Sequence, residues 1–89
     1  MSRLRYNAGQ DVRLGDSIRW GQADVGSVVV MIAEQTAMPG YDAGEWDYLG
    51  DGCMLYVPSA GLVHYRPKGL VADAGVVLVQ RAGPSVGPD

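Results

Sequence analysis

The sequence is poor in the residues from which metal sites, disulfides and covalent catalytic sites are built. Its 89 residues include one cysteine, Cys53, and one histidine, His64. A lone cysteine excludes a disulfide within the chain, and a conventional zinc site needs several converging His, Cys or carboxylate ligands. We therefore predict a protein without a metal ion or another cofactor.

Long apolar segments are also missing. The longest unbroken apolar run, residues 28–33, has six residues, whereas a membrane-spanning helix needs about 20. Residues 1–5 lack the apolar stretch of a secretory signal. Together with the lone cysteine, these absences favour a cytoplasmic bacterial protein that does not enter a membrane.

Enough apolar residues remain to build a core. They make up 47% of the chain, which argues against a disordered protein. The length fits one domain, which we place at residues 1–82. Residues 83–89 contain two prolines and two glycines and are expected to form a flexible tail.

Thirteen glycines separate short runs rich in β-branched residues, a spacing typical of a small all-β protein. The run at 25–33 is apolar on both faces and should be the central strand. Residues 34–44 are predicted to form a long loop, 45–49 one helical turn, and 67–69 a turn. Strands are predicted at Ser17–Trp20, 25–33, Cys53–Val57, 62–65 and Val76–Gln80. The fold class is therefore a small antiparallel β-barrel of about five strands with one short helical turn.

The order of elements over residues 11–32 resembles a known architecture. A tight turn at Gly15 and Asp16 precedes a strand carrying Trp20, and Gly26 opens the valine-rich strand. This order is similar to the opening of Src-homology-3-like and KOW-type barrels. The resemblance implies a module that binds a peptide, a protein or a nucleic acid, but it supplies no site residues. The proline-binding aromatic pattern of true Src-homology-3 domains is absent from this sequence.

A second likeness lies in the later part of the chain. Residues 45–49, Glu-Trp-Asp-Tyr-Leu, and residues 61–65, Gly-Leu-Val-His-Tyr, resemble segments of short uncharacterised bacterial proteins of toxin–immunity type. This likeness implies an immunity-type inhibitor. It matches no characterised motif and therefore assigns no residue a role.

Charge is distributed unevenly along the chain. The net charge is −3 and the pI is about 4.8, which argues against a general nucleic-acid binder. No Lys or Arg occurs from Trp20 through Tyr65. Such a one-signed stretch can attract a partner of opposite charge, or it can simply be a solvated loop. The acidic residues of this stretch are Asp24, Glu34, Asp42, Glu45, Asp47 and Asp51.

Every aromatic residue is a Tyr or a Trp, the types that are enriched in protein interfaces. Three of them lie among the acidic residues. We therefore predict a non-enzymatic protein-interaction module whose aromatic residues enter a basic cleft of a toxin or enzyme, while its carboxylates pair with Arg or Lys. For Trp46 the alternative is a core residue that plugs one end of the barrel. The predicted partner-binding residues are Tyr41, Asp42, Glu45, Trp46, Asp47, Tyr48 and Asp51.

Catalytic arrangements find little support. Cys53 or Ser59 would need His64 as a base, but Cys53 begins an apolar strand and Ser59 lies in a plain turn. Glu45 and Asp47 form a carboxylate pair, but a chain of this length has little room for a sugar cleft. We therefore do not expect an enzyme.

Two other functions remain open. A KOW-like nucleic-acid module would use Arg3, Arg5, Arg13 and Arg19, although the acidic pI argues against it. A structural subunit would instead assemble with its own copies through an exposed strand edge.

Overall fold

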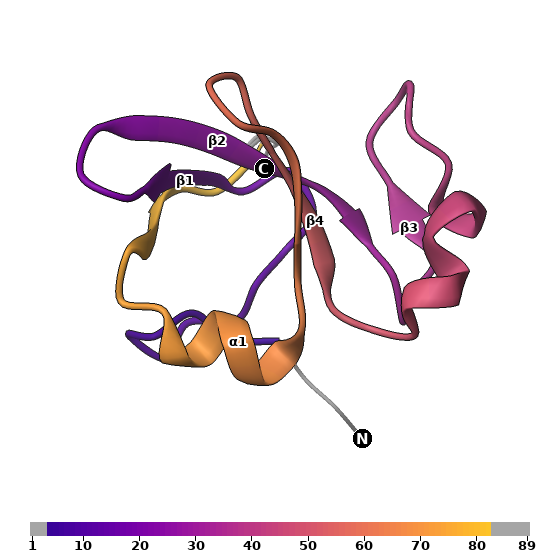
Figure 1. Ribbon diagram of the computed structural model, residues 1–89, viewed down its shortest axis with the longest axis horizontal. Helices are drawn as coiled ribbons and strands as arrows, with labels where there is room; N and C mark the ends of the chain where they lie inside the picture. The colour runs from indigo at the N-terminus through magenta and orange to yellow at the C-terminus, as the bar shows by residue number, and fades with distance from the viewer. Residues whose placement is uncertain (1–3, 83–89) are drawn as a thin grey trace, which may run out of the picture.

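A curved antiparallel sheet of six strands is the framework of the computed structural model, which describes residues 4–82 (Figure 1). The predicted tail at 83–89 and Arg3 lie outside the described residues. The strand order is β5-β4-β2-β1-β6, and β3 pairs with the far end of β2. The elements are β1 (Ser17–Trp20), β2 (Asp24–Met31), β3 (Thr36–Ala37), the 3₁₀ helix η1 (Ala43–Leu49), β4 (Cys53–Val57), β5 (Gly61–Tyr65), α1 (Pro67–Ala72) and β6 (Val76–Gln80).

The sheet is open, so the predicted barrel is wrong although the mostly β character is confirmed. The strands β5 and β6 end the strand order on opposite sides and do not pair with each other. The chain passes between them through α1, which spans the open side of the sheet in Figure 1. A helix in this connection leaves both edges without a strand partner, whereas closure would require them to pair.

The helix α1 replaces the turn that was predicted at 67–69. Proline is tolerated in the first helical turn because its missing N–H would have no partner there, and Pro67 occupies that position. Leu70 is fully buried and fixes the helix on the sheet. The predicted helical turn at 45–49 is confirmed and begins earlier, as the 3₁₀ helix η1.

Two core clusters lie on opposite faces of the sheet. The inner face packs against the N-terminal segment and α1, through Leu4, Tyr6 and Leu70. The predicted inward positions Ile18 and Trp20 both contact this first cluster. The second cluster lies on the outer face under β3 and η1, which Figure 1 shows beside β4.

A β-bulge in β2 explains how one valine run serves both clusters. Val28 pairs with Leu55 and Val30 pairs with Met54, so Val29 is an extra residue on the β2 side. Val28 and Leu55 belong to the first cluster, whereas Val29, Val30 and Met54 belong to the second. From Val28 to Met31 the strand is therefore covered on both faces, as the apolar pattern predicted, whereas Val25 near its start is exposed.

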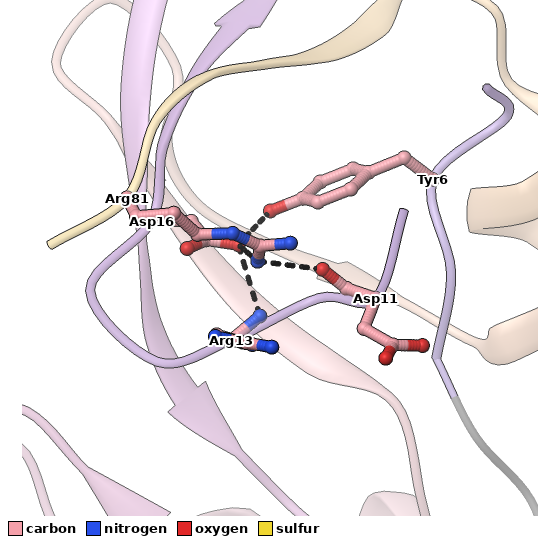
Figure 2. A network of polar contacts seen from close by, with 5 residues as sticks. All are labelled: Tyr6, Asp11, Arg13, Asp16 and Arg81. Atoms are coloured by element: carbon pink, nitrogen blue, oxygen red, sulfur yellow. Dashed lines mark hydrogen bonds and ion pairs between the residues drawn. The ribbon is translucent and has the colours of Figure 1, made fainter. Parts of the chain in front are cut away.

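The carboxylate of Asp16, which is 0% exposed, joins segments that are distant in the sequence (Figure 2). Its Oδ2 atom accepts hydrogen bonds from the Tyr6 hydroxyl at 2.6 Å, the Arg13 backbone N–H at 2.9 Å and the Arg81 guanidinium at 3.0 Å. Arg81 also donates to the backbone oxygen of Asp11 at 2.7 Å. A buried carboxylate is costly unless it is paired and hydrogen-bonded, and here the N-terminal segment and the end of β6 supply the donors.

A second polar chain links β1, β5 and the end of α1. The Trp20 indole N–H donates to the Tyr65 hydroxyl at 3.1 Å, and that hydroxyl donates to Asp73 Oδ2 at 2.6 Å. Asp73 also accepts from the Gly75 N–H at 2.8 Å. Side-chain hydrogen bonds therefore connect β1 and β5 across the inner face, where no strand pairing does so.

We predict that Tyr6→Phe lowers the free energy of unfolding by roughly 1–3 kcal/mol near neutral pH, because a buried acceptor loses a donor. Burial and the hydrogen bond to Asp16 raise the pKa of Tyr6 well above its ordinary value. Above pH of about 10 the unfolded chain can release this proton while the folded chain cannot, so stability falls as the pH rises.

The Phe variant should therefore lose stability less steeply in alkaline solution than the wild-type protein. Urea unfolding near neutral pH and above the ordinary tyrosine pKa measures both effects. Tyr48→Phe is the matched control, since Tyr48 is 78% exposed. A Tyr6→Phe variant that matches the wild-type protein at both pH values would contradict the assignment.

Candidate functional site

The acidic stretch folds as a capped 3₁₀ helix held against the outer face of the sheet. The Asp42 side chain caps η1 by accepting from the Gly44 N–H at 2.9 Å. Gly50, with a φ of 89°, ends the helix, and its N–H donates to the Asp47 carbonyl at 2.9 Å. Before the helix, the Met38 N–H donates to the Val29 carbonyl at 2.8 Å. The predicted loop 34–44 is therefore wrong in part, because it contains the short strand β3, which pairs with β2, and the start of η1.

One side of η1 forms part of the second core cluster. Ala43 is buried, and Trp46 and Leu49 are partly buried against the cluster. Tyr41, just before the helix, packs there as well. The Trp46 indole nitrogen is buried and has no hydrogen-bond partner among the described residues. These contacts show that Trp46 packs against the sheet.

The other side of η1 is exposed and acidic. Tyr48 is 78% exposed, the highest value among the large exposed hydrophobic residues of the described chain. Asp42, Glu45 and Asp47 are exposed beside it on the same helix and its cap. We call these four residues, Asp42, Glu45, Asp47 and Tyr48, the acidic surface.

Gln35 fixes the acidic surface to the sheet. Its amide nitrogen donates to Asp47 Oδ1 at 2.5 Å and to the Ile32 carbonyl at 2.8 Å. Gln35 itself has a positive φ of 56°, a conformation that is uncommon for a residue with a side chain. The loop that follows β2 is thus turned back toward η1, which limits the freedom of the helix before any partner binds.

Asp51 has different surroundings from the other predicted carboxylates. It is partly buried and lines a hollow of about 300 Å³ together with Arg66 and Lys68. Its carbonyl oxygen lies 3.0 Å from the His64 Nε2 atom. The structure therefore places Asp51 beside Arg66 and Lys68, and not on η1 with the other predicted carboxylates.

The nucleophile candidates are separated by the sheet. Cys53 pairs with Tyr65, and Met54 pairs with His64, so the alternation of β4 and β5 turns Cys53 and His64 to opposite faces. Burial raises the pKa of the Cys53 thiol to about 12. Ser59 lies in the turn before β5, at the end of that strand away from His64. Neither pair forms a nucleophile and base in contact.

The arginines proposed for nucleic-acid binding are partly engaged within the protein. Arg5 donates to the Gly9 carbonyl at 3.1 Å and forms an ion pair with Asp11 at 3.8 Å. Arg13 and Arg19 are exposed. Arg19 lies on β1, whereas Arg5 and Arg13 belong to the preceding N-terminal segment.

Sequence reasoning missed a groove on the outer face. It has a volume of about 380 Å³ and is lined mainly by Val25, Tyr56, Pro58 and Val79. The run at 25–33 was predicted to be covered on both faces, so the pattern gave no sign that Val25 would stay 63% exposed. The one available signal was the position of Tyr56 between Leu55 and Val57. Alternation along a strand places Tyr56 on the face opposite these two buried residues.

The described residues, 4–82, contain no group of three or more His, Cys, Asp or Glu side chains that could hold a metal ion. Over the same range no helix has the length and apolar character needed to span a membrane. Comparison of the chain with models of protein families, with curated proteins and with solved structures gives no match.

We predict that Cys53 resists alkylation in the folded protein and reacts only on unfolding. Its thiol is buried, and the raised pKa keeps the reactive thiolate scarce at neutral pH. Modification by iodoacetamide, followed by mass spectrometry across a urea series, should track the unfolding transition. Rapid modification without urea would show that the thiol is accessible.

We also predict that Trp46→Ala and Tyr48→Ala differ in stability. Trp46→Ala removes a ring from the second core cluster and should cost about 2–4 kcal/mol. Tyr48→Ala removes a mostly exposed ring and should change stability by less than about 0.5 kcal/mol. Urea unfolding followed by circular dichroism measures both, and equal losses would contradict the assignment of Trp46 to the core.

Proposed function

We propose that this protein is a non-enzymatic protein-interaction module that binds a basic partner through its acidic surface. The observation that carries the proposal is the exposure of Tyr48, 78%, on a helix whose other aromatic residue packs against the sheet. Tyrosine is one of the residues that most often dominate binding energy in interfaces, because its ring gives contact area and its hydroxyl a hydrogen bond.

Charge supports a basic partner. Asp42, Glu45 and Asp47 are exposed on η1 and its cap together with Tyr48, and the chain has no Lys or Arg from Trp20 through Tyr65. An acidic field of this kind accelerates the encounter with a positively charged protein and disfavours acidic ones. The finer form of the proposal is an immunity-type inhibitor that occupies a basic cleft of a toxin or enzyme.

The helix is held in place before binding. The Asp42 cap, the Gly50 end and the Gln35 hydrogen bonds fix η1, and Trp46 anchors it to the second cluster. A preorganised surface loses little conformational entropy on association, which favours tight binding by a small contact area. In this proposal Trp46 supports the surface, and Tyr48 enters the partner.

The test is affinity capture from a lysate of the source organism with three immobilised proteins: the wild type, Tyr48→Ala and Tyr56→Ala. Tyr56 is the matched control because it is a second exposed tyrosine, 41%, on a different part of the surface. We expect the wild type and Tyr56→Ala to retain a basic protein. With Tyr48→Ala the retained amount of that protein should fall at least about tenfold. Raising the salt concentration should weaken this retention.

Two results would contradict the proposal. One is a retained protein that binds equally to Tyr48→Ala and to the wild type. The other is retention of nucleic acid alone at low salt, which would favour nucleic-acid binding through Arg5, Arg13 and Arg19.

A further inference from the structure

The outer face of the sheet is divided into a covered half and a bare half. Met54 and Tyr56 lie two residues apart on β4 and therefore face the same side. The helix η1 covers Met54, whereas Tyr56 is 41% exposed. In Figure 1 β3 and η1 stand beside β4, and no described element lies over the β1–β2 hairpin.

Apolar side chains gather on the bare half. The described chain has six exposed large hydrophobic residues, and four of them lie at strand positions of this half. A contiguous apolar patch of this kind on a small protein marks an interaction site more often than chance exposure does. The four residues are Val25, Tyr56, Leu62 and Val79.

A bulge helps to shape a groove within this half. The pairing of β1 with β6 shifts between Ser17 and Ile18, so Val79 is an extra residue that lines the groove with Val25 and Tyr56. The groove volume of about 380 Å³ is large enough for one aromatic ring. Its lining is mainly apolar. An aromatic ring that enters the groove is therefore removed from water, which is favourable.

The charge of the bare half is opposite to that of the acidic surface. Arg19 alternates with Ser17 on β1 and pairs with Val25, so it lies on this half beside the groove. It is the one Lys, Arg, Asp or Glu among the described strand positions that alternate onto the bare half. Glu45 and Asp47 flank the exposed Tyr48 on the covered half.

We propose that two copies of this chain associate through their outer faces, each placing Tyr48 in the groove of the other. The helix η1 protrudes from the covered half, whereas nothing described protrudes from the bare half. A two-fold axis between the copies therefore places η1 of each copy over the bare half of the other. The contact is isologous and closed, which gives a dimer. The carboxylates beside Tyr48 then lie near Arg19 of the other copy.

This inference rests on the proposed function only in using the same acidic surface. A dimer of this kind would cover Tyr48, so a basic partner and a second copy would compete for it. The groove residues belong to the self-association alone, and they separate the two proposals.

The test is sedimentation velocity over micromolar to millimolar protein concentration. We expect the average mass to rise with concentration from 9.5 kDa toward twice that value and no further. Val79→Ser and Tyr48→Ala should each raise the dimer Kd at least about tenfold. Val71→Ser is the matched control, since it removes a 43% exposed valine from α1, away from the outer face, and should leave Kd unchanged.

A charge exchange tests the orientation. Arg19→Glu and Glu45→Arg should each weaken the dimer by introducing like charges, and the double variant should recover at least part of the lost affinity. Circular dichroism confirms that each variant is folded. Three results would each overturn the proposal: a monomeric mass at every concentration, masses beyond the dimer, or a dimer Kd that Val79→Ser and Tyr48→Ala leave unchanged.

The two proposals fail separately. If Val79→Ser dissociates the dimer but the wild type captures no basic protein through Tyr48, only the proposed function is wrong. If Val79→Ser behaves as the wild type in sedimentation while Tyr48→Ala loses a captured basic protein, only the dimer is wrong.

Discussion

The hydrogen bonding of the buried Asp16 carboxylate is the constraint on which the rest of the structure depends. Donors reach it from Tyr6, from the backbone of Arg13 and from Arg81, which lie at the two ends of the described chain. A carboxylate with no exposure must keep these partners, so the N-terminal segment and the end of β6 are held at the start of β1. The Asp16 backbone adds to this by accepting from the Val28 N–H at 2.9 Å.

The position of β1 and β2 then determines the outer face. Because Val28 faces inward beside Asp16, the bulge at Val29 places Val29 and Val30 in a second core on the outer face, while Met31 returns to the first core. That second core carries η1, and η1 presents Tyr48 and its carboxylates to solvent. The covered half therefore follows from the burial of Val29 and Val30 on the outer face of β2, and the bare half begins where the same strand is exposed at Val25.

The strands could be predicted from the local sequence pattern, but whether the sheet closes into a barrel could not. Ser17–Trp20, Cys53–Val57 and Val76–Gln80 follow directly from β-branched and alternating residues. An open sheet and a barrel share those strands and differ in whether the edges pair, which depends on the helix that Pro67 begins. For the candidate site, the sequence supplied the acidic and aromatic residues. It could not separate Trp46 from Tyr48, because their different sides are set by packing on Met54 and its neighbours.

We propose that the outer face, with Tyr48 exposed on it, is where two copies of this chain meet. The most direct test of this proposal is NMR on an equal mixture of isotope-labelled and unlabelled copies at millimolar concentration. We expect nuclear Overhauser effects between the labelled methyl groups of Val25 and Val79 and the unlabelled ring of Tyr48. Intermolecular contacts confined to the edges of β5 and β6, or no intermolecular contacts at all, would contradict it.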